Sequence, residues 1–226
     1  MCGRYTLVCI DNLGLRFRIF DPMIGCRSHF NVAPSAMMPV IVRHKRTEAL
    51  TMKWGLISHL VHNANTSTHP INARAESLLE RPMFSSLLER NRCLVPASGF
   101  YEWKTEGKRT VPFYIHMKKN SLFAFAGLYD IWNDMSGVLH QTYTIITTTS
   151  NELIAPLHNR MPAILKQDDE ERWLSGDPLS RDDLEELLVP YPCEEMTAYP
   201  VSSQVNNPAR DEEQLISPLA NLLEDF

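Results

Sequence analysis

The segment MCGRYTL at the start of the chain places a cysteine at position 2. When the initiator Met1 is removed, Cys2 becomes the N-terminus and carries a free amine and a thiol on adjacent carbons. Their pKa values of about 8 and about 8.5 leave a nucleophilic fraction of each at neutral pH. The amine can condense with an aldehyde to an imine, and the thiol can then close a five-membered thiazolidine ring. The alternative is that Cys2 is a small buried hydrophobic residue, as free cysteines often are.

Two further motifs carry polar groups that suit acid–base chemistry. PINARAE places Asn72 and Arg74 two residues apart beside a proline, at an expected helix start. SGFYEWK places Glu102 between a tyrosine and a tryptophan. Aromatic neighbours partly desolvate a carboxylate and raise its pKa, which suits a general acid. The alternative for Glu102 is a surface position on a strand whose aromatic residues face the core.

A third motif, PLHNRMP, places His158 and Arg160 in a turn between an expected helix and an expected strand. Catalytic groups are common in such loops. The chain has 8 histidines, and most histidines in a protein are structural or solvated. Sequence spacing alone does not bring Cys2, Asn72, Glu102 and His158 together.

The composition is that of a water-soluble globular protein of 226 residues. The 5 cysteines form no CxxC pair, so neither a zinc site nor a disulfide framework is indicated. No apolar run of about 18 residues predicts a membrane span, and the N-terminus does not resemble a signal peptide. We therefore expect a reducing, cytoplasmic location in which a thiol persists.

Charge is distributed unevenly along the chain. Residues 1–120 carry 17 Lys and Arg against 8 Asp and Glu, whereas residues 121–226 carry 5 against 19. The basic part can bind phosphates locally despite the net charge of −5. The alternative is that the acidic residues decorate solvated helices and the basic excess is incidental.

The elements that must position these groups are mostly short strands. Alternation over residues 2–8 predicts a strand with Cys2, Arg4 and Thr6 on one face. HFNVAPS (29–35) predicts a turn-rich loop, and further strands are expected at 37–43, 48–55, 93–104, 111–117, 122–132, 140–150 and 194–202. Helices are expected at 71–92, in two pieces interrupted at Pro82, and at 150–158, 168–176 and 179–190. The pattern predicts one α+β domain with a mostly antiparallel, curved, barrel-like sheet flanked by short helices.

Seven motifs in one order indicate a family. MCGRYTL, NVAPS, MKWGL, PINARAES, CLVPASGFYEWK, FAFAGLYDIW and TTTSNELIAPLHNRMPAIL follow one another along residues 2 to about 205. In this the chain resembles the SRAP (SOS response-associated peptidase) family. The resemblance implies a single domain over 1–226, with its core at about 2–205 and a tail or helix at 206–226. It also implies a curved α+β barrel beside a positively charged groove.

The resemblance implies a function as well. Members of the family crosslink covalently to abasic sites, chiefly in single-stranded DNA, and can release their own initiator methionine. We therefore expect a DNA damage response protein with single-turnover crosslinking, lyase-like and autocatalytic cysteine peptidase activity. It would act at the nucleoid as a monomer, without cofactor, metal or membrane. By matching motifs, the implied catalytic residues are Cys2, Asn72, Glu102 and His158. The implied DNA-binding residues are Arg4, Pro34, Arg74 and Arg160.

One loop departs from the family pattern. Bacterial members carry an aromatic pair before INAR that wedges against the bases near the lesion. Here the loop LISHLVHNANTSTHP (56–70) has no aromatic residue except histidine. His59, Leu60 and His62 are the candidates to replace the pair.

Two other classes of protein also fit an N-terminal cysteine or a basic half. Amidohydrolases with an N-terminal nucleophile mature by autoprocessing. They have a four-layer sandwich of helices and sheets, which this strand-rich pattern does not predict. A non-covalent DNA- or protein-binding module would use the basic residues alone.

Overall fold

Five strands close on themselves to form the centre of the molecule. The computed structural model describes residues 2–8, 13–19, 27–60 and 68–219. The barrel runs β10–β4–β3–β6–β9 and returns to β10, so every strand in it has two partners. Its strands are β3 (Met37–Arg43), β4 (Thr47–Trp54), β6 (Arg92–Ala97), β9 (Phe123–Asn133) and β10 (Leu139–Thr149). Closure removes the exposed sheet edges that an open sheet would present.

Three short strands extend the barrel sheet where β9 and β10 diverge. They are β5 (Asn72–Arg74), β11 (Arg160–Pro162) and β12 (Ile164–Leu165). β5 and β4 pair with β10 in parallel, and the other described pairings are antiparallel. The predicted α+β fold with a mostly antiparallel, barrel-like sheet is confirmed.

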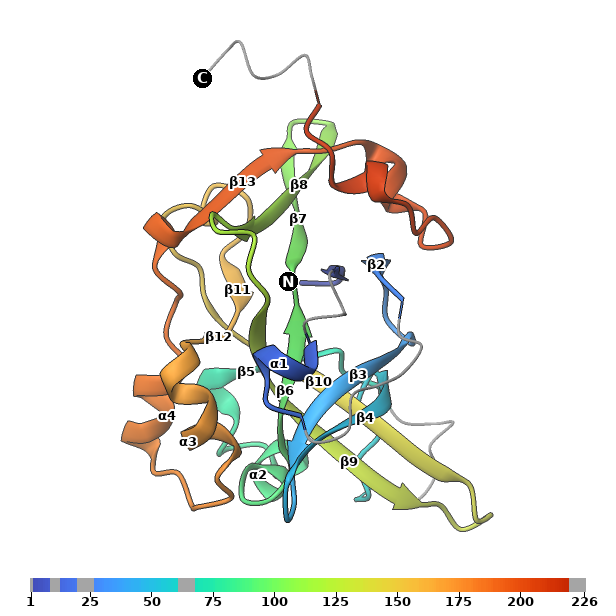
Figure 1. Cartoon of the computed structure of the whole chain (residues 1–226), viewed down its shortest axis with the longest axis vertical. Helices are drawn as coiled ribbons and strands as arrows, with labels where there is room; N and C mark the ends of the chain where they lie inside the picture. The colour runs from blue at the N-terminus through green and yellow to red at the C-terminus, as the bar shows by residue number, and fades with distance from the viewer. Residues whose placement is uncertain (1, 9–12, 20–26, 61–67, 220–226) are drawn as a thin grey trace.

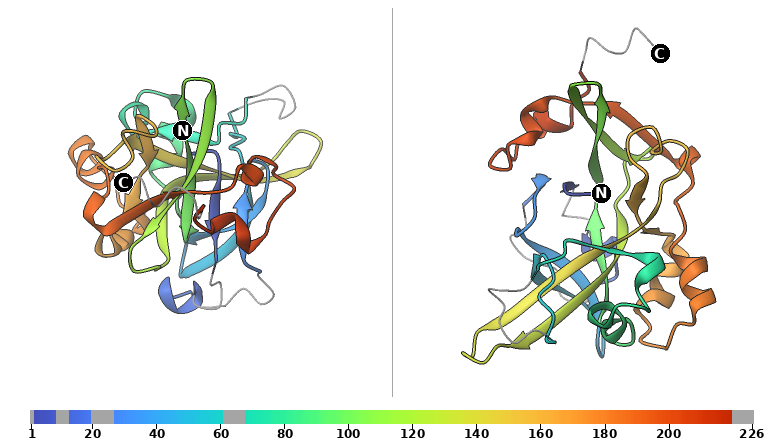
Figure 2. Two further views of the ribbon diagram at one scale, coloured as in Figure 1. Left: turned by 90° about the horizontal axis from the view of Figure 1, so that it is seen from above. Right: turned by 180° about the vertical axis from the view of Figure 1, so that it is seen from behind.

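A second sheet lies against one end of the barrel and carries the start of the chain (Figure 1). Its order is β13–β8–β7–β1–β2, with β2 at its edge. The strands are β1 (Tyr5–Leu7), β2 (His29–Val32), β7 (Gly99–Glu106), β8 (Arg109–Met117) and β13 (Met196–Pro200). β1 pairs with β2 on one side and with β7 on the other, and Figure 2 shows the same fold from above and from behind. Because β1 is an interior strand, its flanking residues are held from both sides.

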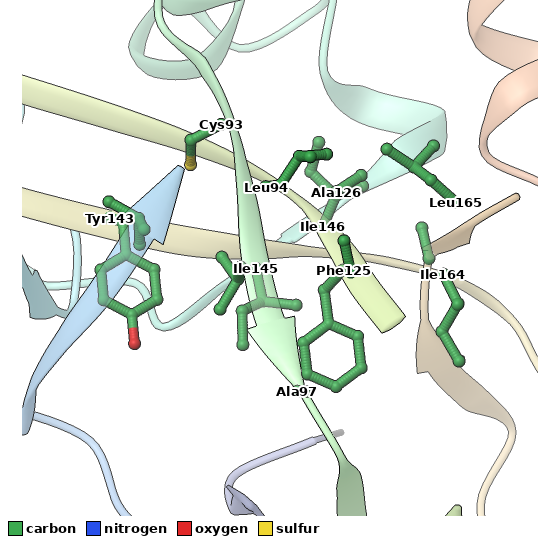
Figure 3. Close-up of a cluster of buried hydrophobic side chains, with 14 of the residues drawn as sticks. Cys93, Leu94, Ala97, Phe125, Ala126, Tyr143, Ile145, Ile146, Ile164 and Leu165 are labelled. Carbon is green, nitrogen blue, oxygen red and sulfur yellow. The ribbon is translucent and has the colours of Figure 1, made fainter. Parts of the chain in front are cut away.

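The hydrophobic core fills the barrel and continues into the interface between the barrel and the second sheet. Figure 3 shows side chains of β6, β9, β10 and β12 converging, among them Phe125, Tyr143 and Ile145. Tyr5 of β1 packs edge-on against Trp54 and Phe125, with ring centroids 5.2 and 5.9 Å apart. Its hydroxyl lies 2.8 Å from that of Tyr143. Such buried aromatic pairs stabilise by about 1 kcal/mol beyond their buried area, so β1 is fixed firmly to the barrel.

The helices are short and lie outside the sheets. They are α1 (Leu13–Arg16), α2 (Pro82–Leu88), α3 (Glu170–Leu174) and α4 (Arg181–Leu187). Short 3-10 helices are η3 (Ala75–Ser77), η4 (Gln167–Asp169), η5 (Cys193–Glu195), η6 (Ser203–Asn206) and η7 (Glu213–Ile216). The predicted helices near 168–176 and 179–190 are confirmed, and Ser180 forms a capping box with Asp183 at the start of α4.

Four local predictions were wrong in part. Residues 2–8 form a strand only at Tyr5–Leu7, and 29–32 form β2 instead of a loop. The region 71–92 begins as strand β5, and Pro82 starts helix α2 instead of interrupting one, because proline suits the first helical turn. Residues 152–157 are turns: Asn151 Oδ1 accepts from Ile154 N as at a helix start, but Pro156 has no N–H to continue a helical hydrogen-bond ladder.

The close contact of Gly99 with Tyr114 yields a stability prediction. A Cβ on Gly99 would lie 2.4 Å from ring atoms of Tyr114, whose side chain is buried. We expect Gly99→Ala to lower the free energy of unfolding by about 1–3 kcal/mol through overpacking. A double-mutant cycle by denaturant titration checks it. The cost should fall close to zero in a Tyr114→Ala background, and an equal cost in both backgrounds would contradict the assigned clash.

Candidate active site

Cys2 lies immediately before β1 with no exposed surface. Its Sγ donates to the carbonyl oxygen of Arg4 at 3.5 Å, and that oxygen also accepts from Tyr101 N of β7 at 3.0 Å. Burial raises the pKa of the Cys2 thiol, and the charge of Glu102 raises it further. The thiol is therefore protonated at rest, and any reaction through it needs a base.

Asn72 contacts the Cys2 backbone directly. Its Nδ2 donates to the Cys2 carbonyl oxygen at 2.9 Å. Its Oδ1 is buried and has no hydrogen-bond partner among the described residues. β5 holds this side chain in place through the parallel pairing of Asn72 with Ile145 of β10. A buried amide with an unused acceptor is suited to receive a hydrogen bond from a reacting amine or hydroxyl.

Glu102 is the buried carboxyl group of the site. It lies on β7 opposite Phe113 and is 2% exposed. Burial raises the pKa of Glu102 to about 7, because the charged form loses its hydration. Its effect on the pKa of Cys2 shows that the two groups are neighbours. Glu102 is buried, so the alternative of a surface glutamate is excluded.

His158 follows the turns at 152–157. Its Nδ1 accepts a hydrogen bond from Arg160 N at 2.9 Å, so the neutral ring carries its proton on Nε2. Burial lowers the pKa of His158. Strand pairing brings its segment close to Asn72, because β5 and β11 flank the same end of β10 on opposite edges. Asn72 and Glu102 are therefore both neighbours of Cys2, and the segment of His158 flanks the same end of β10 as Asn72.

Arg160 has protein partners at its guanidinium. Nη1 and Nη2 form a bidentate pair with Glu76 at 2.7 and 3.0 Å, and Nη2 also donates to Thr147 O at 2.6 Å. The pair holds the pKa of Glu76 below its usual range. These contacts tie the segment of His158 to η3 and β10. The DNA contact of Arg160 stays a prediction.

The other three predicted DNA-binding residues differ in their surroundings. Arg4 donates to Asn31 Oδ1 at 2.8 Å and to backbone carbonyls of the C-terminal segment. Arg74 and Pro34 are exposed, and Pro34 precedes Ser35 at a φ of 72°. Arg74 is therefore more exposed than Arg4, which is half-buried.

The loop that departs from the family pattern is described only at its two ends. His59 donates from its backbone N, at 2.8 Å, to Asp130 Oδ2, and its ring Nδ1 lies 2.7 Å from the same oxygen. Leu60 is 50% exposed. His62 lies outside the described residues. The replacement of the aromatic pair by His59 or Leu60 stays a prediction.

Comparison with known proteins decides the family. The family model "SOS response associated peptidase (SRAP)" matches residues 1–208. The chain belongs to the SRAP family. This SRAP chain is 41% identical over 221 residues to "Abasic site processing protein YoaM" of Bacillus subtilis, covering 96% of the chain and 97% of that protein. It is 30% identical over 211 residues to "Abasic site processing protein HMCES" of Xenopus tropicalis, covering 79% and 62%.

Solved structures agree with the SRAP assignment. A crystal structure of a Bacteroides thetaiotaomicron protein is similar with a TM-score of 0.87 and 29% identity, covering 96% of this chain and 100% of that one.

Among the described residues, no group of three or more His, Cys, Asp or Glu side chains is placed to hold a metal ion. No helix in the described part of the chain is long and apolar enough to cross a membrane.

Sequence reasoning missed the contacts that surround Arg4. Asn31 lies in the NVAPS motif, yet its segment was predicted as a loop, and residues 206–226 were expected as a tail or helix. In the structure Leu215 is buried and Asp211 accepts hydrogen bonds from β2. The only sequence signal was an asparagine beside apolar residues, which is too common to be informative.

Proposed function

We propose that this protein binds abasic sites, mainly in single-stranded DNA, and crosslinks to them through Cys2 as a thiazolidine. The observation that carries the proposal is the hydrogen bond from Asn72 to the Cys2 carbonyl, with the buried Glu102 beside the same cysteine. The names of the relatives, abasic site processing proteins, support DNA lesions as the substrate class. The chemistry requires removal of residue 1, because the α-amine of Cys2 must be free.

The first step is opening of the abasic sugar. An abasic deoxyribose is mostly a closed hemiacetal, and opening needs a proton on the ring oxygen. Glu102 suits this role, because a carboxyl group with a pKa of about 7 is protonated in about half of the molecules at neutral pH. As the ring oxygen takes the proton of Glu102, the C1′ hydroxyl gives its own proton to water, and the products are a C1′ aldehyde, a C4′ hydroxyl and a glutamate carboxylate.

The amine of Cys2 then attacks C1′ and forms a carbinolamine. Loss of hydroxide as water requires a proton, which the protonated form of His158 can deliver from Nε2 in the turn beside β11; burial lowers the pKa of His158, so this form is the stronger acid. Asn72 orients the nucleophile, because its Nδ2 holds the Cys2 carbonyl and its Oδ1 can accept a hydrogen bond from the amine. The result is a protonated imine between N and C1′, because the nitrogen keeps its remaining proton.

The thiol closes the ring in the last step. Its raised pKa means that a base must take the proton as sulfur adds to C1′. The Glu102 carboxylate, left charged by the first step, is the neighbouring base. The overall reaction joins protein and sugar and releases one water molecule. The same pair of groups would reopen the ring in the reverse direction.

The remaining expected properties are part of the proposal. The exposed Arg74 and the basic half of the chain would hold the phosphate backbone of a lesion-containing strand. Removal of Met1 by the protein itself, lyase-like activity and a nucleoid location rest on the family alone. The barrel differs from the four-layer sandwich of N-terminal-nucleophile amidohydrolases, so that alternative is disfavoured.

The direct test uses purified protein with a verified N-terminal Cys2 and single-stranded DNA bearing one abasic site. We expect a slow band on a denaturing gel that survives heating and requires the lesion. Binding without a covalent band would favour a non-covalent module. Turnover of amide substrates without any band would favour an amidohydrolase.

Replacing Asn72 is expected to slow crosslinking. Asn72→Leu keeps the approximate volume but removes the donor to the Cys2 carbonyl and the buried acceptor. Loss of about 1–3 kcal/mol of oriented hydrogen bonding corresponds to about a 5- to 150-fold slower adduct formation at saturating DNA. Asn133→Leu, at an exposed position of β9, is the matched control and should react at the wild-type rate. An unchanged rate in Asn72→Leu would remove Asn72 from the mechanism.

A further inference from the structure

The segment 203–211, here called the C-terminal clamp, lies along the open edge of β2. The chain passes over the second sheet after β13 and descends beside β2 (Figure 1). Asp211 Oδ1 accepts from Phe30 N at 2.5 Å and from Asn31 N at 3.1 Å, as a neighbouring strand would. Trp103 of β7 donates from Nε1 to Asn206 Oδ1 at 2.8 Å. The clamp therefore joins the outer strand of the sheet to the strand that carries Glu102.

Asn31 is the centre of these contacts. Its side chain is buried, with 5% of the residue exposed. Nδ2 donates to three clamp carbonyls, those of Val205 at 3.2 Å, Asn207 at 3.1 Å and Arg210 at 2.8 Å. Oδ1 accepts from Arg4 Nη1 at 2.8 Å. One amide thus links β2, the clamp and the residue two positions after Cys2.

Arg4 is held at both ends. Its guanidinium donates to Asn31, to Val205 O at 2.7 Å and to Asn206 O at 3.3 Å. Its carbonyl accepts from the Cys2 thiol and from Tyr101 N, the residue before Glu102. No residue between Cys2 and Tyr5 belongs to a strand. The hydrogen bonds of the Arg4 side chain and of the Arg4 carbonyl therefore hold the start of the chain where strand pairing does not.

We propose that Asn31 is a positioning residue for the crosslinking reaction and that the C-terminal clamp is part of the active site. Asn31 fixes the position of the Arg4 guanidinium, and the guanidinium in turn fixes the position of the Arg4 backbone. The Arg4 carbonyl then holds Cys2 in its position beside Glu102 and Asn72. Arg4 then has a structural role within the protein in addition to its predicted role in DNA binding. The inference rests on the proposed function, because it concerns the rate of the same reaction.

Removing the Asn31 side chain takes one donor from three clamp carbonyls and one acceptor from the Arg4 guanidinium, which keeps its hydrogen bonds to Val205 O and Asn206 O. Cys2 then keeps its hydrogen bonds with Asn72 and with the Arg4 carbonyl, but the side chain of Arg4 has lost one of its anchors. A displacement of about 1 Å at a reacting centre can slow a reaction about 100-fold. The defect should appear in the chemical step, since Asn31 is buried and does not face a ligand.

The test is single-turnover crosslinking of Asn31→Ala at saturating abasic-site DNA, compared with Asn133→Ala. We expect the rate constant of Asn31→Ala to fall at least 10-fold while the final fraction crosslinked stays within 20% or so of the wild-type value. DNA affinity, measured by anisotropy in a Cys2→Ala background, should change less than about 3-fold. Asn133→Ala should match the wild type in all three quantities.

Three results would overturn the inference. One is a wild-type rate constant in Asn31→Ala. Another is a lower final fraction at a wild-type rate constant, which would mean that Asn31 only supports folding. The third is a slower reaction that is fully explained by weaker DNA binding. If Asn31→Ala does not fold, Asp211→Ala tests the inference by the same criteria. We expect its single-turnover rate constant of crosslinking to fall at least 3-fold. Absence of any adduct with wild-type protein would instead reject the proposed function itself.

Discussion

Replacing Cys2 by alanine is expected to eliminate the heat-stable DNA adduct completely. Cys2→Ala keeps an α-amine at the N-terminus, so imine formation remains possible, but no thiol is present to close the ring. The imine hydrolyses when the gel sample is heated, and the covalent band should fall by at least about 1000-fold from the wild-type yield. The measurement is the crosslinked fraction after denaturing electrophoresis, with the N-terminus of each sample verified by mass spectrometry.

A reductant separates the roles of the amine and the thiol. Borohydride converts an imine to a stable amine, so Cys2→Ala and Cys2→Ser should both regain a band when it is present during the reaction. Cys2→Ser is the matched control, since its hydroxyl is close in size to the thiol but far less nucleophilic at neutral pH. A heat-stable band from Cys2→Ala without reductant would reject the thiazolidine. Absence of a band with reductant would reject the amine as the nucleophile.

The candidate site was predictable as a set of residues, but not as a geometry. Cys2, Asn72, Glu102 and His158 were each identified from their motifs. Their convergence depends on the parallel pairing of Asn72 with Ile145, which joins segments far apart in the sequence. No local pattern encodes that register, because it is set by how the barrel closes. For the same reason INAR was expected at a helix start, whereas the edge of β10 draws it into a strand.

The roles of the arginines show a second limit of the sequence. Arg4, Arg74 and Arg160 have the same side chain, and the resemblance assigned all three to DNA. The structure separates them by their partners, since clamp carbonyls hold Arg4, Glu76 holds Arg160, and Arg74 is exposed. Every residue has a backbone carbonyl, so the sequence does not indicate which carbonyls accept hydrogen bonds from Arg4. A contact such as Arg4 with Val205 spans most of the chain and follows only from the complete fold.

Replacing Glu102 by glutamine is expected to slow adduct formation by about 100- to 1000-fold at pH 7.5, within the range typical of general acid–base catalysis. Glutamine retains the size and a hydrogen-bonding carbonyl but cannot transfer a proton. The measurement is the single-turnover rate constant at saturating abasic-site DNA. Glu106→Gln, an exposed glutamate on the same strand, should react at the wild-type rate.

The pH dependence makes this prediction specific for the role of Glu102. The wild type needs a protonated Glu102, which is lost as pH rises through about 7, and a neutral amine, which is gained as pH rises through about 8. The rate constant should therefore rise to a maximum between these values and fall tenfold per pH unit above them. In Glu102→Gln the alkaline fall should disappear, because no carboxyl group remains to titrate, so the gap between variant and wild type narrows above pH 8. If the rate constant of the variant still falls at alkaline pH, that part of the pH profile belongs to another group. If the rate constant is lower by the same factor at every pH, Glu102 supports the structure of the site without donating a proton.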